Sequence, residues 1–241
     1  MLDILYLDDY LAAVTKPPGL LVHRTGLDAG ETQFALQMLR DQLGRPVWPA
    51  HRLDKGTSGV LLFALSADTA RLLGQAFESG QNLQKTYRAV VRGWPADSGR
   101  IDHALKRMPD DARTERTEIQ PAQSLFSTLR RFELPLTYQG FASTRCAEVA
   151  LQPLTGRRHQ LRRHMKHIAH PILGDATHGK GPLNRAVADL IGQQRLWLHA
   201  LRLDMRHPVS GQALQLESPL PKEWALWEAH PTEPHPLSPQ V

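Results

Sequence analysis

The chain has 241 residues, of which 41% are hydrophobic and 22% charged, and its net charge is +5. These values fit a folded globular protein and permit a polyanionic partner without requiring one. The single cysteine excludes an internal disulfide framework and any cysteine-rich metal site, and no apolar run reaches the roughly 18–20 residues of a membrane helix. The N-terminus lacks the basic region of a signal peptide, so we expect a cytoplasmic protein with no membrane association.

The first half of the chain predicts a hairpin followed by helices and further strands. The strands expected there are residues 4–7, 11–15, 59–65 and 86–92. Helices are expected over 32–43 and from the N-cap Ser66 through Glu78, each followed closely by a glycine.

The second half begins with a polar excursion over 97–120 that predicts short strands at most. Further strands are expected over 123–132, 143–151, 195–203 and 213–217, with helices over 158–168 and around Trp224 and Trp227. Four prolines after residue 230 predict a disordered tail over 231–241, which leaves one domain over 1–230. Strands outnumber helices without regular alternation, so we expect an α+β fold.

Positive charge is concentrated in residues 151–210, which contain ten Lys and Arg residues against three Asp residues. A solvated cationic face is one interpretation of this excess. A groove that follows phosphates is the other.

The segment His51-Arg52-Leu53-Asp54-Lys55-Gly56-Thr57-Ser58-Gly59 precedes the apolar strand at 59–65. The flanking strand can hold this glycine-bent loop in place, so that the short Asp54 side chain presents its carboxylate. The alternative is a polar turn in which Asp54 bonds to backbone amides.

A second motif runs from Thr155 to Met165 with the sequence TGRRHQLRRHM. On a helix, Leu161, Met165 and Ile168 form the buried stripe, and Arg162 lies at its edge, partly buried. Arg163 points away and can reach phosphate; the alternative is a basic helix with solvated arginines.

A tyrosine between basic residues is the third candidate. Tyr87 follows Lys85 on a predicted strand and precedes Arg88. It can stack on a nucleobase, or it can simply pack in the core.

Three other patterns do not support a site. GDATHGKG at 174–181 has Gly181 where a phosphate-binding loop needs Ser or Thr. The histidines of 159–207 have no carboxylate or thiolate at metal-ligand spacing, so we expect no metal. A hydrolase built on Ser58 lacks the G-x-S-x-G spacing.

The motifs HRLDKGTSG, KTYRAVVRG and TGRRHQLRRHM followed by HPILGD resemble, in order and spacing, those of the RluA-type pseudouridine synthases. The resemblance extends from about Leu2 to Trp227. It implies an α+β catalytic fold with a mixed, largely antiparallel central sheet, flanking helices and two subdomains around a cleft. It also implies isomerisation of uridine to pseudouridine in RNA without a metal or organic cofactor.

Site residues follow from the same resemblance, position by position. Asp54 matches the catalytic aspartate, Tyr87 the tyrosine that stacks on the target base, and Arg162 the basic residue that pairs with the aspartate. Arg52 resembles the arginine that fills the RNA stack after base flipping. Phosphate contacts are expected from the arginines and lysine at the start of the basic segment, namely Arg157, Arg158, Arg163 and Lys166.

The reaction breaks a C–N bond, turns the uracil and forms a C–C bond at C5. The aspartate can attack the base, attack C1′, or remove the C2′ proton to give a glycal, and these routes stay open. Each needs Asp54 ionised in a pocket that excludes water, where an arginine offsets the effect of burial.

Two longer stretches, at 156–181 and 195–211, resemble family members that act on uridine 65 of tRNA. Lys55-Gly56 departs from the proline-containing pair of those members, so an enzyme acting on rRNA, or on both RNAs, is the alternative. The first expected strand begins at about Ile4, which leaves no room for an S4-like domain before it. We expect a monomer. The non-enzymatic alternative is an RNA-binding module without catalytic activity.

Overall fold

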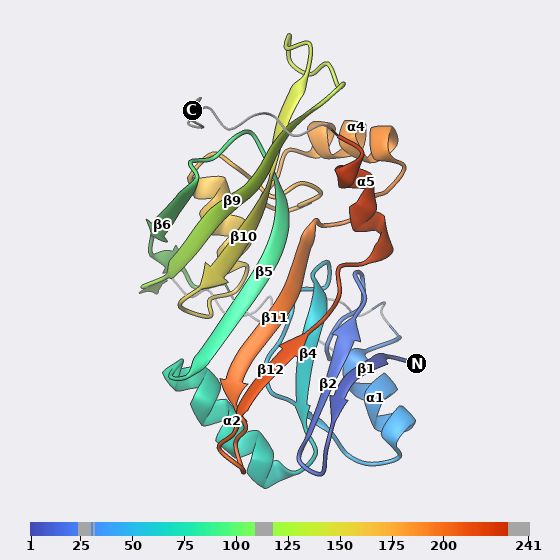
Figure 1. Ribbon diagram of the computed structural model, residues 1–241, viewed down its shortest axis with the longest axis vertical. Coiled ribbons are helices and arrows are strands. Elements are labelled where there is room, and N and C mark those ends of the chain that lie inside the picture. The colour runs from blue at the N-terminus through green and yellow to red at the C-terminus, as the bar shows by residue number, and fades with distance from the viewer. Residues whose placement is uncertain (24–29, 31, 109–117, 231–241) are drawn as a thin grey trace, which may run out of the picture.

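The computed structural model describes residues 1–23, 30, 32–108 and 118–230. One large sheet crosses the molecule, with its main strands in the order β1-β2-β4-β11-β5-β10-β9-β6 (Figure 1). Its strands are β1 (Asp3–Leu7), β2 (Leu11–Lys16), β3 (Trp48–Pro49), β4 (Ser58–Ala64), β5 (Leu83–Arg92), β6 (Ser98–Asp102), β9 (Gln123–Leu134), β10 (Thr144–Pro153), β11 (Leu198–Arg206) and β12 (Ala213–Glu217).

The sheet is mixed and largely antiparallel, which confirms the predicted fold class. β4 and β11 run parallel, whereas the other described pairs of this sheet are antiparallel. A separate small ribbon pairs β7 (Leu105–Lys106) with β8 (Ile119–Gln120). The helices are α1 (Ala35–Leu43), α2 (Ala67–Ser79), α3 (Gln160–His167), α4 (Gly181–Ile191), the short 3-10 turn η1 (Lys222–Trp224) and α5 (Ala225–Glu228).

Helices cover both faces of the sheet in each of its two halves. In the half built on β2 and β4, α1 buries Leu39 on one face and α2 buries Leu73 on the other. In the half built on β5, β9 and β10, α3 packs Met165 on one face, while α4 and α5 pack Val187 and Trp227 on the other. Tyr87 contacts both the α1-side and the α3-side cluster, so it lies where the two halves meet.

Most predicted elements are present, and the differences have local causes. Ser66 caps α2 by accepting a hydrogen bond from the Thr69 amide, as its position predicted. The helix expected over 158–168 begins only at Gln160, because His159 takes a left-handed backbone conformation. β11 begins at Leu198 rather than Arg195, and the helix expected from residue 32 begins at Ala35.

Sequence analysis missed α4 entirely. Its start carries Pro182 in the first turn and its end is followed by Gly192 in the left-handed conformation, two ordinary helix signals. Leu183 and Val187, four residues apart, form its buried side. The rejected phosphate-loop pattern at 174–181 ends where this helix begins, and no element was expected over 182–191.

Strand pairing places the two central motifs beside each other. Gly59 on β4 pairs with Ala200 on β11, and Ala200 pairs in turn with Tyr87 on β5. A Cβ atom at Gly59 would lie 2.1 Å from the Ala200 carbonyl oxygen, so this parallel contact requires glycine. The loop that carries Asp54 therefore opens beside Tyr87.

The expected tail at 231–241 lies outside the described residues, and the domain boundary at 230 remains a prediction. Across the part of the chain that is described, no helix combines the length and apolar character needed to span a membrane.

Candidate active site

Asp54 sits on a tight turn that leads into β4. Its carbonyl oxygen accepts a hydrogen bond from the Thr57 amide at 3.0 Å. Lys16, fully buried at the end of β2, donates through Nζ to the carbonyl oxygens of Pro17, Leu20 and Lys55. Burial lowers the pKa of Lys16 to about 7, and the nearby Asp54 charge opposes this shift. Lys16 thus ties the Asp54 turn to the neighbouring loop.

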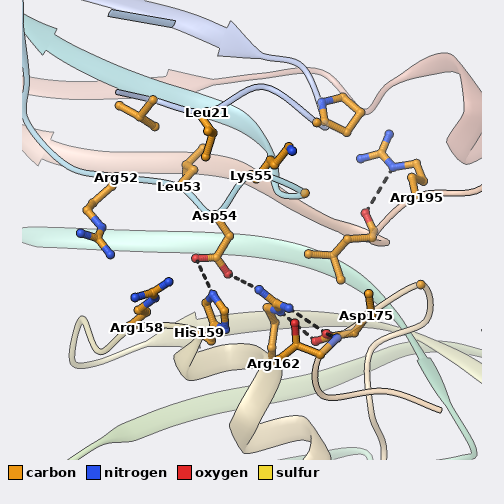
Figure 2. A pocket seen from close by; sticks show the side chains of 18 of the residues that line it. Leu21, Arg52, Leu53, Asp54, Lys55, Arg158, His159, Arg162, Asp175 and Arg195 are labelled. Carbon is orange, nitrogen blue, oxygen red and sulfur yellow. Dashed lines mark hydrogen bonds and ion pairs between the residues drawn. The ribbon is translucent and has the colours of Figure 1, made fainter. Parts of the chain in front are cut away.

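The carboxylate of Asp54 meets the guanidinium of Arg162, which rises from α3 (Figure 2). Arg162 Nη1 donates to Asp54 Oδ2 at 3.0 Å, across 108 residues of sequence. The Arg162 side chain is 9% exposed and that of Asp54 is 25% exposed. The predicted ion pair is therefore present, with Arg162 at the edge of the buried stripe as its helical position indicated.

A second carboxylate, Asp175, holds Arg162 from the other side. Arg162 Nε and Nη2 donate to the two oxygens of Asp175 at 2.8 and 2.7 Å. Because Nε and Nη2 are occupied in this side-on pair, the remaining Nη1 edge is directed at Asp54. The guanidinium cannot rotate toward Asp54 without breaking two charged hydrogen bonds.

Backbone geometry delivers Asp175 to this place. Gly174 has φ +75°, and a Cβ there would lie 1.7 Å from the Arg195 carbonyl oxygen. The Asp175 side chain is completely buried, and its Oδ1 also accepts from the amides of Thr177 and His178. Burial alone raises the pKa of Asp175, but the hydrogen bonds from Arg162 and these amides outweigh it and lower the pKa.

His159 stands beside Asp54 on the opposite side from Asp175. Its Nε2 lies 3.8 Å from Asp54 Oδ1, and its Nδ1 lies 3.0 Å from Nε2 of His178. Burial lowers the pKa of His159 to about 4, with the Asp54 charge opposing the shift. The imidazole is therefore neutral near pH 7.

Two hollows share a wall made by Asp54, His159 and Arg162. One, of about 660 Å³, is also lined by Tyr87 and Leu198. The other, of about 870 Å³, extends past Asp175 on the far side of the ion pair. Burial raises the pKa of Tyr87, and the Asp54 charge raises it further, so the phenol keeps its proton.

A third hollow, of about 400 Å³, adjoins Asp54 and is strongly basic. Four of the five predicted RNA-binding residues line it, namely Arg52, Arg157, Arg158 and Arg163. The fifth, Lys166, is exposed on α3 and does not line it.

Two of these arginines also support the ribbon of β7 and β8. Arg157 Nε donates to the Pro121 carbonyl, and Arg163 Nη1 donates to the Lys106 carbonyl. The helical position of Arg163 suggested a side chain free in solvent, but the structure shows it bound to the Lys106 carbonyl.

The arrangement can hold an ionised carboxylate at a cavity wall next to an aromatic ring and a neutral imidazole. Asp54, Arg162 and Tyr87 were predicted from the sequence, whereas Lys16, His159 and Asp175 had no predicted role. For Asp175, the available signal was its place at the end of HPILGD, the motif that follows the basic helix.

Ser58 and His199 form a buried structural chain rather than a nucleophile pair. Arg195 Nη2 donates to Ser58 Oγ at 2.6 Å, and Ser58 Oγ lies 2.8 Å from His199 Nδ1. Both side chains are buried at 1% exposure or less. Among the described residues, no three His, Cys, Asp or Glu side chains are grouped so as to hold a metal ion.

Comparisons with known proteins identify the family of this chain. The model of the RNA pseudouridylate synthase family matches residues 10–167. tRNA pseudouridine synthase C of Yersinia pestis is 48% identical over 228 residues, covering 93% of this chain and 88% of that protein. The Vibrio vulnificus protein of the same name is 46% identical, covering 93% of each chain.

Solved structures extend the likeness to the fold. Human RNA pseudouridylate synthase domain containing 1 superposes with a TM-score of 0.73 at 25% identity, covering 97% of this chain and 89% of that one. Human RNA pseudouridylate synthase domain containing 4 gives 0.69 at 27% identity, covering 93% and 90%. From the match of the family model and these relatives, the chain belongs to the RNA pseudouridylate synthase family.

Proposed function

We propose that this protein isomerises one uridine of tRNA, uridine 65, to pseudouridine, with Asp54 as the reacting carboxylate. The observation that carries the proposal is the Asp54–Arg162 ion pair at the wall of a cavity that also contains Tyr87. A silent RNA-binding module has no use for such a pair. The substrate class is supported by the relatives named tRNA pseudouridine synthase C.

Asp54 acts in its ionised form in this proposal. Arg162 stabilises the negative charge, since a guanidinium stays protonated throughout the accessible pH range. One Asp54 oxygen accepts from Arg162, while the other faces His159 at 3.8 Å. That second oxygen is the one available to the sugar or the base, whichever of the three routes the reaction follows.

Tyr87 receives the target base. C1′ and C5 are shielded in a stacked helix, so the nucleotide must leave the stack at a cost of a few kcal/mol. Stacking on an aromatic ring returns about 1–3 kcal/mol per base. Arg52, exposed beside Asp54, fills the vacated place in the RNA stack and hinders return of the base.

The phosphates of the RNA follow the basic hollow beside Asp54. Arg157, Arg158 and Arg163 line it, and Lys166 extends the positive surface along α3. Such contacts position the RNA and make its binding dependent on salt. In this proposal the enzyme acts as a monomer in the cytoplasm, where it meets its tRNA substrate.

The second candidate is an enzyme that acts on rRNA, or on both RNAs. The sequence Lys55-Gly56 after Asp54 favours it, because it departs from the proline-containing pair expected in members that act on uridine 65. Lys55 and Gly56 both line the larger hollow, where they are placed to contact RNA.

Mapping pseudouridine in tRNA and rRNA from cells with and without this protein tests the proposal. We expect loss of the modification at uridine 65 of tRNA and its return when the wild-type protein is supplied. Loss confined to rRNA would support the second candidate, and no change in either RNA would refute both.

Asp54→Asn tests the reacting residue in the same assay. The variant keeps the shape of the side chain but lacks its charge, so we expect no pseudouridine and RNA binding within a few fold of wild type. Retained turnover would remove Asp54 from the reacting role. Asp189→Asn, an exposed acid on α4, is the matched control.

A further inference from the structure

We propose that His159 is a further catalytic residue: its Nε2 accepts the proton that leaves C5 of the uracil, and His178 carries that proton onward. The inference rests on the proposed pseudouridine synthase reaction. It adds a group for a step that neither Asp54 nor Arg162 is arranged to perform alone.

Position is the first support. His159 lines all three hollows that meet at Asp54, and its Nε2 is 3.8 Å from Asp54 Oδ1. Figure 2 shows its ring directly below the Asp54 carboxylate, between the side chains of Arg158 and Arg162. In the product, C5 is bonded to C1′, the sugar carbon next to which Asp54 works. A proton leaving C5 therefore departs close to the Asp54 carboxylate and within reach of this imidazole.

A relay leads away from the ring. His159 Nδ1 and His178 Nε2 are 3.0 Å apart, with the two rings edge to face. His178 is fixed by its own amide, which donates to the buried Asp175 carboxylate. When His159 Nε2 takes up a proton, Nδ1–H can donate its proton to His178, which restores a neutral His159.

The backbone at His159 is held in an unusual conformation that presents the ring. Its φ is +54° and ψ is +25°, the left-handed region that non-glycine residues seldom adopt. His159 precedes α3 but makes no side-chain capping bond there; Gln160 instead uses its Oε1 to accept from the Arg157 amide. Residues kept in such conformations gather at functional sites, and here the result is a ring turned to the cavity.

Protonation states leave His159 able to accept a proton. Burial lowers its pKa to about 4, the Asp54 charge opposes that shift, and Arg162, His178 and Arg158 reinforce it. The Tyr87 phenol keeps its proton, and a guanidinium has no lone pair to offer. Asp54 accepts from Arg162 through Oδ2, and its Oδ1 is the oxygen that reacts with the sugar or the base in the proposed function.

The step balances within the isomerisation. Cleavage of the C1′–N1 bond leaves its electron pair on N1 of the uracil. After C1′ bonds to C5, the C5–H bond breaks; its electron pair forms the C5=C6 double bond and its proton goes to His159 Nε2. One proton is returned to N1 from solvent or from the relay, so nothing is gained or lost overall.

His159→Asn is the test variant, because asparagine tolerates the left-handed conformation and can hydrogen bond to His178 but cannot take up a proton. With a tRNA transcript as substrate, we expect kcat to fall by about 10²–10⁴-fold while RNA binding stays within a few fold. With uridine deuterated at C5, we expect a larger isotope effect on kcat than in wild type, since proton removal becomes limiting. Loss of a merely structural contact would slow the variant without raising the isotope effect.

Three further proteins make the result decisive. His159→Gly keeps the backbone conformation, and added imidazole should restore part of its activity. His167, an exposed histidine on α3, the helix that follows His159, provides the matched control, and His167→Asn should behave as wild type. Lys85→Gln removes an amine that also lines the Tyr87 hollow and should leave the isotope effect unchanged.

Turnover by His159→Asn within threefold of wild type would overturn the inference. So would a loss of activity with an unchanged isotope effect and no rescue by imidazole, or an isotope effect that appears in Lys85→Gln instead. If the wild-type protein released no deuterium from C5 of any transcript, the proposed function itself would be refuted. That outcome differs from a failure of the His159 inference alone, in which the wild-type protein is active.

Discussion

Replacing Asp175 by Asn tests whether one buried carboxylate holds the whole ion-pair arrangement. Asp175 has a completely buried side chain and accepts four hydrogen bonds, two from Arg162 and two from the Thr177 and His178 amides. Asparagine retains one acceptor oxygen but turns an NH2 group toward donors. Arg162 then loses one of its two counter-charges.

The expected cost follows from that geometry. Breaking a buried ion pair by removing one partner costs about 3–5 kcal/mol. Because Asp54 still neutralises Arg162 and the amide keeps one acceptor, we expect the lower end, about 3 kcal/mol. For a domain of this size that corresponds to a fall in Tm of roughly 6–12 °C.

Activity should fall as well, for a separate reason. Without Asp175, the guanidinium is free to turn and bind both oxygens of Asp54, which withdraws the oxygen meant for the substrate. Misplacement by about 1 Å can cost on the order of 100-fold in rate. We therefore expect kcat to drop at least about tenfold with unchanged RNA binding.

Thermal unfolding and single-turnover conversion of a tRNA transcript measure the two effects, with Asp189→Asn as the exposed control. If the Tm of Asp175→Asn lay within about 2 °C of wild type, the ion pair between Asp175 and Arg162 would not stabilise the fold as expected. A large loss of Tm with full activity at low temperature would refute its control over Arg162.

Three more predictions concern stacking, phosphate binding and pH. Tyr87→Phe should retain most of kcat/KM, whereas Tyr87→Leu should lose the roughly 1–3 kcal/mol of stacking; equal values for the two would contradict a stacking role. Arg163→Ala should weaken RNA binding and reduce the slope of log Kd against log salt by about one, and an unchanged slope would place Arg163 off the phosphate path. Burial lowers the pKa of His199 to about 4, so the unfolded chain takes up a proton first as pH falls. Stability should then decrease by about 2 kcal/mol between pH 6.5 and 5, as followed by urea unfolding, and this part of the loss should be absent in His199→Asn.

Local patterns in the sequence determined most of the elements and marked three side chains, Asp54, Tyr87 and Arg162, as candidates for the site. The spacing of Leu161 and Met165 fixed the buried side of α3 and so placed Arg162 at its edge. The apolar run after Asp54 predicted a strand, and Ser66 predicted the start of α2. Helix and strand periods of a few residues are encoded in neighbouring positions, which is why these expectations were confirmed.

The resemblance to a known family predicted one long-range contact that hydrophobic periodicity cannot predict. Motif resemblance, rather than spacing, paired Asp54 with Arg162 across 108 residues, and the structure contains that pair. The pairing depends on the parallel contact of β4 with β11 and on the position of β5 beside β11. Strand order of this kind has no local signal.

Tertiary structure alone decided that Asp175, Lys16 and His159 surround the Asp54–Arg162 pair. Asp175 follows Gly174, where a Cβ atom would collide with the Arg195 carbonyl, a neighbour supplied by a distant loop. Lys16 is buried because three carbonyl oxygens from two loops converge on it. A charged side chain enters the interior only where partners from elsewhere in the chain already surround it, and no stretch of sequence announces that meeting.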